Sequence, residues 1–221
     1  MKKIVLTFDD ACKSHLEIAV PILKKYGFNA TFFISLPQVW FDDCLQGFLS
    51  HDEIAELHKL GFELGNHTMN HHSLQLLSDD EIRRELSLMN DFLAKRGAAK
   101  PVSFAYPGGP YAANAAAIIP EFGLKYARTT EHALWDKNTD LMRIPCFSIC
   151  DKQEENFRKA LDFPEQNENS GAVILYHGVP DIAHAHCSTK LELFEAHMKY
   201  LYDNKYQVVS MADFGEMLEK N

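Results

Sequence analysis

The sequence predicts an α/β fold in which a mostly parallel sheet or barrel is covered by helices on the outside. Short apolar or β-branched runs alternate with helical patterns along the whole 221-residue chain. The runs IVLTF, TFFI and AVILY are almost continuously apolar, as strands buried on both faces are. Glycines also stand where several of the helical patterns stop. A chain of this length has room for one ordinary domain, and we expect a single domain over residues 1–221.

Eight short segments have the composition of strands. They are residues 4–8, 30–34, 62–65, 102–106, 126–129, 142–147, 172–176 and 207–210. Six other segments carry apolar residues three and four positions apart, which indicates amphipathic helices. They are residues 14–26, 51–60, 79–95, 111–118, 154–161 and 189–203. The remaining long segments, residues 36–49 and 130–141, are expected to be loops.

Composition excludes several classes of protein. Hydrophobic residues at 46% and charged residues at 24% are near the average for folded domains, so the chain is not disordered. The net charge of -9 gives no basic surface for nucleic acid or an anionic membrane, and we expect neither as a partner. The opening MKKIVLTFDD lacks the apolar core of a signal peptide, and no window is apolar enough to span a bilayer. Five cysteines without a C-x-x-C pair suggest neither a disulfide framework nor a thiolate zinc site, so we expect a cytoplasmic protein.

Residue types used in catalysis follow the carboxyl ends of several predicted strands. Parallel α/β folds build their active sites from these strand ends, so the side chains there are expected to meet. They are Asp9 and Asp10 after the first strand, His67 and His71 after the third, Tyr106 to Gly109 after the fourth, Arg143 in the sixth, and His177 after residues 172–176.

His67 and His71 are candidate metal ligands. Two imidazoles four residues apart face the same way if the segment forms one helical turn, although such a pair is more often a cap or a surface feature. No glutamate lies between them, so the H-E-x-x-H protease motif is excluded. Asp10 at a neighbouring strand end would complete a set of two histidines and one carboxylate with an open position.

The adjacent carboxylates Asp9 and Asp10 support a cation at this place. Two buried carboxylates repel each other, and a metal bound by Asp10 would remove the problem and leave Asp9 free as a base. His177 follows the most apolar strand, where it is either a packed core histidine or a catalytic group. The segment Pro107 to Pro110 is either a tight turn or a source of bare backbone N–H groups for an oxyanion.

These strings, in this order, resemble the polysaccharide deacetylase family, carbohydrate esterase family 4, whose shared unit is the NodB homology domain. TFDD at residues 7–10 resembles its first motif, T-F-D-D-G. HTMNH at residues 67–71 resembles its second motif, H-[S/T]-x-x-H, and LYH at residues 175–177 resembles its last, L-x-H. The resemblance spans nearly the whole chain. It implies a distorted (β/α) barrel of about seven parallel strands with outer helices.

The resemblance also implies a metal site and two catalytic groups. Asp10, His67 and His71 would hold a divalent metal, usually Zn2+, with Co2+, Ni2+ or Mn2+ as alternatives. Asp9 would be the general base and His177 the general acid. The implied reaction is hydrolysis of an N-acetyl group, or less often an O-acetyl group, on an amino sugar, oligosaccharide or polysaccharide, which releases acetate.

Substrate contacts are implied in the same way. Leu175 would line the pocket for the acetyl methyl group, the backbone N–H of Gly108 would help to hold the oxyanion, and Tyr106 would contact substrate. Three further aromatic residues are candidates to stack on a sugar ring. They are Trp40, Trp135 and Tyr111.

The sequence departs from the family pattern in several places. Ala11 stands where the first motif ends in glycine, a position that carries no chemistry. The third motif normally begins with an arginine that orients the catalytic aspartate, and Ala105 stands there, so we expect Arg143 to supply the guanidinium. The D-W pair whose aspartate positions the acid histidine has no clear counterpart, so the sequence names no partner for His177.

Two other functions remain open at this point. One is hydrolysis of a non-sugar linear amide on the same scaffold. The other is a catalytically weak sugar-binding protein, suggested by Ala105 and the missing D-W pair. The presence of both a candidate base, Asp9, and a candidate acid, His177, argues against a pure binder. The sequence leaves the sugar and the oligomeric state open.

Overall fold

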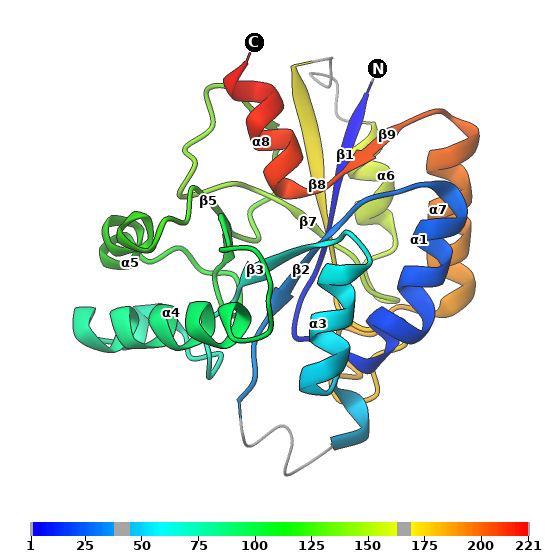
Figure 1. The fold of residues 1–221 in the computed structure, drawn as a ribbon. Helices are drawn as coiled ribbons and strands as arrows, with labels where there is room; N and C mark the ends of the chain where they lie inside the picture. Colours follow the sequence, from blue (N-terminus) through cyan, green and yellow to red (C-terminus); the bar gives the residue numbers. More distant parts are fainter. Residues whose placement is uncertain (1, 38–44, 163–168, 221) are drawn as a thin grey trace.

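A computed structural model describes residues 2–37, 45–162 and 169–220 and contains the α/β fold that the sequence predicts (Figure 1). The strands of the described chain are β1 (Lys3–Phe8), β2 (Thr31–Ile34), β3 (Glu63–Asn66), β4 (Ser103–Ala105), β5 (Tyr126–Arg128), β6 (Trp135–Asp136), β7 (Phe147–Ser148), β8 (Ser170–Tyr176) and β9 (Gln207–Val209). The helices are α1 (Val20–Tyr26), α3 (His51–Lys59), α4 (Asp79–Ala94), α5 (Ala113–Ile118), α6 (Glu155–Leu161), α7 (Leu191–Asp203) and α8 (Met211–Glu219). A π-helical turn (His15–Ala19) leads into α1, and short 3-10 turns cover Leu45–Gly47, Leu74–Leu76 and Ile119–Phe122.

The strands form one mostly parallel, curled sheet with β1 near its centre. Its order is β5-β4-β3-β2-β1-β8-β6, with β7 also paired to β8 and β9 to β1. Among the strand pairs of the described chain, only β6–β8 is antiparallel. β1 pairs with β8 along its whole length, whereas its other edge is shared between β9 and β2. The parallel register brings the carboxyl ends of β1, β2, β3, β4 and β8 to one end of the sheet, as the sequence predicts.

Residues 144–148 contact β5 at one edge of the curled sheet and β8 near the other edge. Ile144 forms an isolated parallel bridge with Arg128 of β5, and Phe147 pairs with Ile174 of β8. The segment leaves β5 before it reaches β8, so it cannot pair continuously with either strand. The expected strand over residues 142–147 is therefore reduced to the two residues of β7 and a single bridge.

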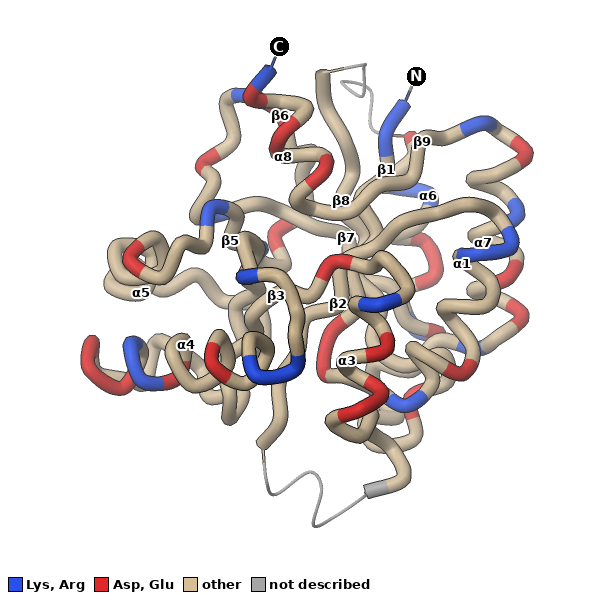
Figure 2. Tube along the Cα trace, viewed as in Figure 1, with Lys and Arg blue, Asp and Glu red and all other residues tan. Residues whose placement is uncertain are grey.

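Helices cover the outside of the sheet, and three of those described begin at a capping serine. Ser50, Ser78 and Ser210 each cap a helix and form a capping box with the residue three positions later. The last of these caps begins α8, which the sequence analysis did not predict. Figure 2 shows acidic and basic residues along the outer helices, while the central strands β2, β7 and β8 carry no charge. None of the helices in the described ranges is both long and apolar enough to cross a lipid bilayer.

Trp135 does not lie on a loop surface. It is fully buried in β6, where its ring packs against Tyr126 and Phe214. The prediction that Trp135 stacks on a sugar ring is therefore wrong, because its faces are already covered by the core. Trp40, the other tryptophan of the prediction, lies outside the described residues.

Candidate functional site

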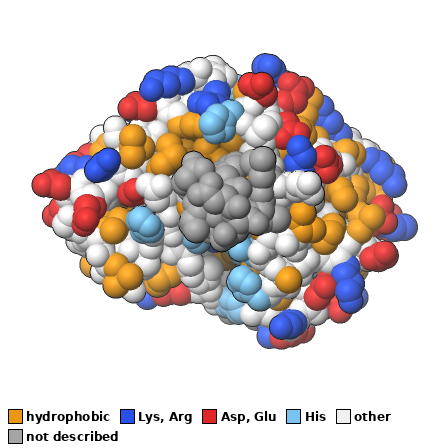
Figure 3. Space-filling view, turned by 90° about the horizontal axis from the view of Figure 1, so that it is seen from below, with side chains coloured by type: hydrophobic (Ala, Val, Ile, Leu, Met, Phe, Trp, Pro, Cys, Tyr) orange, Lys and Arg blue, Asp and Glu red, His pale blue; other side chains and the backbone are white. Residues whose placement is uncertain are grey.

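A cavity of about 430 Å³ opens at the carboxyl ends of the strands. Figure 3 looks onto this end of the molecule, where several histidine side chains gather. Most of the predicted site residues line the cavity. They are Asp9, Asp10, His67, His71, Gly108, Leu175 and His177.

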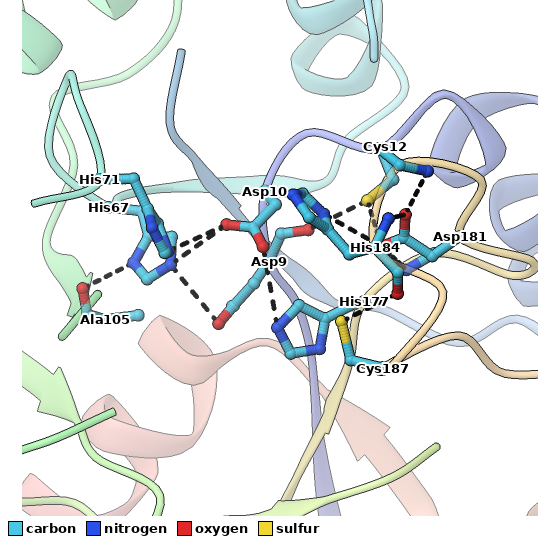
Figure 4. Close-up of polar contacts among 12 residues, drawn as sticks. Asp9, Asp10, Cys12, His67, His71, Ala105, His177, Asp181, His184 and Cys187 are labelled. Atoms are coloured by element: carbon cyan, nitrogen blue, oxygen red, sulfur yellow. Dashed lines mark hydrogen bonds and ion pairs between the residues drawn. The ribbon is translucent and has the colours of Figure 1, made fainter. Parts of the chain in front are cut away.

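Asp10, His67 and His71 form a compact group of possible metal ligands. The Oδ1 atom of Asp10 lies 3.5 Å from Nε2 of His67 and 3.3 Å from Nε2 of His71 (Figure 4). Ligand bonds of 2.0–2.2 Å arranged tetrahedrally separate neighbouring donor atoms by about 3.3–3.6 Å. Both distances from Asp10 therefore match the spacing that a small divalent cation requires, and all three donor atoms lie within 4.8 Å of one another.

The backbone that positions these ligands is not helical. Thr68 and His71 have φ angles of 62° and 54°, in the left-handed region, so a folded loop rather than a helical turn brings the two imidazoles together. The Thr68 hydroxyl accepts a hydrogen bond from the backbone N–H of His71 at 3.1 Å and stabilises this loop. Asp10 and Ala11 are also left-handed, with φ angles of 73° and 50°. Left-handed residues other than glycine are uncommon and concentrate at functional sites.

Burial and hydrogen bonding prepare the group for a cation. Oδ1 of Asp10 is buried and has no hydrogen-bond partner among the described residues, which is costly for an ionised carboxylate without a cation. Nδ1 of His67 lies 2.7 Å from the carbonyl oxygen of Ala105. A carbonyl only accepts, so Nδ1 carries the proton and Nε2 remains available as a ligand. The residues present therefore fit a divalent metal.

The pKa values of the group follow from its burial and its charges. Burial raises the pKa of Asp10, but the nearby His67 and His71 outweigh this effect and hold the pKa below its ordinary value. Burial, together with His67, lowers the pKa of His71 to about 4. His67 is equally buried, but it faces both Asp9 and Asp10, and these charges raise its pKa overall.

Arg128, not Arg143, orients Asp9. Nη2 of Arg128 lies 2.6 Å and 2.5 Å from the two carboxylate oxygens of Asp9, and both side chains are buried. The guanidinium of Arg143 instead lies at the surface and pairs with Glu131 at 2.6 Å. The prediction for Arg143 is wrong because this residue lies between β6 and β7, outside the strands, and its side chain is 49% exposed.

Arg128 also explains how the chain tolerates Ala105. The two residues are direct partners in the β4–β5 ladder, so the guanidinium comes from the neighbouring strand. Burial lowers the pKa of Arg128, but Asp9 outweighs this effect and the net pKa is raised, so the group stays charged. The sequence offers one signal for this residue, a single arginine within the expected short strand over residues 126–129.

His177 lines the same cavity as His67 and His71. Its Nε2 is 3.7 Å from Oδ2 of Asp10, and its side chain is 18% exposed. Its buried Nδ1 has no hydrogen-bond partner among the described residues. The carbonyl oxygen of His177 accepts a hydrogen bond from Nε2 of His15 at 3.1 Å, which fixes the backbone there.

The predicted substrate contacts divide into two groups. Leu175 and Gly108 line the cavity, and Gly108 has the positive φ of 71° that a tight turn requires. Tyr106 does not line this cavity, because its ring is 1% exposed and its hydroxyl donates to the carbonyl of Met142 at 3.0 Å. The prediction that Tyr106 contacts substrate is therefore not supported. Tyr111 is partly exposed, and its ring packs under the guanidinium of Arg143.

Comparison with known proteins agrees with the resemblance seen in the motifs. Residues 1–127, more than half of the chain, match the family model described as polysaccharide deacetylase. The chain belongs to the polysaccharide deacetylase family. A curated member, the poly-beta-1,6-N-acetyl-D-glucosamine N-deacetylase of Staphylococcus aureus (strain COL), is 29% identical over 178 residues, which are 76% of this chain and 61% of that protein. The chain thus spans about three fifths of this relative's length.

Solved structures of the family share the fold of this deacetylase-family chain. A peptidoglycan deacetylase from Bacillus subtilis superposes with a TM-score of 0.65 at 23% identity, over 99% of this chain and 92% of the other. A CE4 family pseudoenzyme from Bacillus anthracis superposes with a TM-score of 0.65 at 20% identity, over 96% of this chain and 65% of the other. The family fold therefore carries both deacetylases and a pseudoenzyme, and the side chains of the site must decide between them.

Proposed function

We propose that this chain is a metal-dependent deacetylase that removes N-acetyl groups from an amino-sugar oligomer or polysaccharide and releases acetate. The observation that carries this proposal is the buried Asp9–Arg128 pair, which lies beside the donor group and faces the same cavity as His177. A sugar-binding protein has no use for a carboxylate that is held in place by a buried guanidinium next to metal donors. Relatives that deacetylate poly-N-acetylglucosamine support the class of substrate.

Each side chain has a role in the proposed reaction. Asp10, His67 and His71 would hold a divalent metal, zinc above all, which would supply Lewis-acid polarisation of the acetyl carbonyl. Asp9, oriented by Arg128, takes a proton from the attacking water as its oxygen bonds to the carbonyl carbon.

The groups on the other side of the cavity complete the reaction. His177 gives a proton to the sugar nitrogen as the carbon–nitrogen bond breaks, so acetate and a free amine leave. Leu175 packs against the acetyl methyl group, and the backbone N–H of Gly108 donates to the oxyanion. Leu175 is suited to this contact because it is an apolar residue at the cavity wall, with 2% of its surface exposed.

Acetate release from a panel of substrates tests the proposal. We expect release from N-acetylglucosamine oligomers or from poly-beta-1,6-N-acetylglucosamine, with little from simple linear amides. His177→Ala should lose on the order of 10² to 10⁴ in turnover, and the matched surface variant His72→Ala should lose none. Preferential turnover of linear amides would favour the amidase alternative.

Metal analysis separates a weak binder from an enzyme. His67→Ala should lose one equivalent of metal together with turnover, whereas His72→Ala should keep both. Full acetate release in the presence of chelator, or sugar binding without any acetate release by the metal-loaded protein, would contradict the proposed function.

A further inference from the structure

A second group of metal-donor side chains lies beside the first. Cys12, Asp181 and His184 each offer one ligand atom, and these atoms all lie within 4.8 Å of one another. Sγ of Cys12 is 3.3 Å from Oδ2 of Asp181, and Nδ1 of His184 is 3.4 Å from the same oxygen. Figure 4 shows this group next to Asp10, which precedes Cys12 by two residues. The proposed deacetylase chemistry uses none of its three members.

We propose that Cys12, Asp181 and His184 bind a second divalent cation of the zinc class, in addition to the metal of the deacetylase site. The spacing supports this, because zinc bonds of 2.0–2.3 Å place tetrahedral donors about 3.3–3.8 Å apart. The distances in the second group match those between Asp10 and the two histidines of the first. Thiolate, imidazole and carboxylate together suit a borderline cation such as zinc and not magnesium or calcium, which prefer oxygen.

The local backbone holds the carboxylate of Asp181 in position. Its Oδ1 accepts hydrogen bonds from the backbone N–H groups of Ala183 at 3.0 Å and His184 at 2.6 Å. Its Oδ2 is thereby directed toward Cys12 and His184, with a longer contact of 3.3 Å from the backbone N–H of Gly178. Hydrogen bonds of this kind orient metal ligands in known sites.

Burial gives the group a reason to bind a cation. Cys12 is 1% exposed and Asp181 is 4% exposed, so both polar groups lie away from water. The carboxylate of Asp181 contacts the Cys12 thiol at 3.3 Å, and Asp10 precedes Cys12 by only two residues, so carboxylates are concentrated beside this buried thiol. A divalent cation would replace the thiol proton and neutralise this concentration of negative charge.

The second cation would connect the two halves of the deacetylase site. Cys12 lies in the turn after β1, which carries Asp9 and Asp10, whereas Asp181 and His184 lie in the loop that follows His177. His184 also lines the main cavity. A cation here would therefore fix the loop after the candidate acid to the turn after the candidate base. Without the cation, the hydrogen bond between Cys12 and Asp181 connects the same turn and loop more weakly.

Cobalt binding tests the proposal, because only the second group contains sulfur. Metal-free protein should bind two equivalents of Co2+, and one of them should produce the near-ultraviolet charge-transfer absorption of a cobalt–thiolate bond. Cys12→Ser should bind one equivalent without this absorption. Cys150→Ser, a matched control at a buried cysteine outside the group, should keep both equivalents and the absorption.

Two further variants keep the test decisive. His184→Ala, at a side chain that is 18% exposed, should also reduce binding to one equivalent, and it replaces Cys12→Ser if that buried variant does not fold. His67→Ala should lose one equivalent but keep the thiolate absorption, so failure of the deacetylase site is distinguishable from failure of this one. A single equivalent without thiolate absorption in the unmodified protein, or two equivalents in both Cys12→Ser and His184→Ala, would overturn the proposal.

Discussion

Replacing Arg128 by methionine should damage both the stability and the activity of this protein. Methionine has a similar length but no charge, so the buried carboxylate of Asp9 loses the group that contacts both of its oxygens at 2.5–2.6 Å. Each side chain of this pair is at most 5% exposed, so water cannot replace the missing guanidinium. The substitution therefore leaves an uncompensated charge inside the sheet.

The size of the effect follows from this burial. Removing one partner of a buried ion pair costs about 3–5 kcal/mol, a large fraction of the roughly 5–15 kcal/mol that stabilises a typical domain. For a chain of this size, such a loss lowers the melting temperature by roughly 6–20 °C. Asp9→Asn combined with Arg128→Met removes both charges. The double variant should therefore lose less stability than the sum of the losses in the two single variants.

Arg143 provides the matched control. Its pair with Glu131 has a similar shortest distance, 2.6 Å, but both side chains are about half exposed, at 49% and 51%. Urea unfolding of Arg143→Ala should therefore give a midpoint close to that of the unmodified protein, because water solvates the remaining carboxylate. Acetate release should fall strongly in Arg128→Met, with metal retained, and stay unchanged in Arg143→Ala. Equal losses in the two variants would refute the assignment of Arg128 as the positioning residue for Asp9.

Three other predictions concern the core, the pH dependence of stability and the cavity. Trp135→Ala should cost about 3–5 kcal/mol in urea unfolding, because it empties a fully buried site. Burial lowers the pKa of His15 and of His197 from 6.5 to about 4, so both are neutral when folded and unfolding takes up protons below pH 6.5. The stability that these two neutral histidines contribute should be fully present above pH 6.5. The free energy of unfolding should then fall by up to about 1.4 kcal/mol per pH unit for each histidine as the pH drops toward 4. A His197→Gln variant whose free energy of unfolding fell equally steeply with pH would contradict this. Gly109→Ala should lower the melting temperature, because φ is +96° and the added Cβ would lie 2.2 Å from the Thr130 hydroxyl oxygen.

The sequence predicted the main elements of the fold because apolar periodicity records which faces are buried. It missed α8 (Met211–Glu219), partly because Gly215 interrupts the helical pattern. The structure supplies the reason for this glycine, since a Cβ there would lie 2.3 Å from the ring of Tyr126. A close contact between segments that are far apart in the sequence produces no periodic pattern. The sequence alone therefore indicates only that this glycine disfavours a helix.

The sequence predicted those features of the site that follow from the order of the strands. Asp9, Asp10 and His177 meet because each follows the end of a parallel strand, and motif order records this. The pairing of Asp9 with Arg128 depends on the lateral register of β4 and β5, to which no sequence pattern corresponds. The surface position of Arg143, which lies between β6 and β7, is set by the same kind of long-range geometry.

The place of β1 in the sheet has a consequence for how the protein is made. Asp10, His67 and His71 all leave the ribosome before β8, and β1 gains this long partner only after Tyr176 is synthesised. Its amino-terminal half waits longer still, for β9 (Gln207–Val209). A nascent chain therefore carries an apolar strand without its main partner while the residues between β1 and β8 are synthesised, which makes folding slow and exposes the strand to aggregation. Pulse-labelling of the growing chain should show β1 protected from hydrogen exchange only after β8 and β9 have been synthesised.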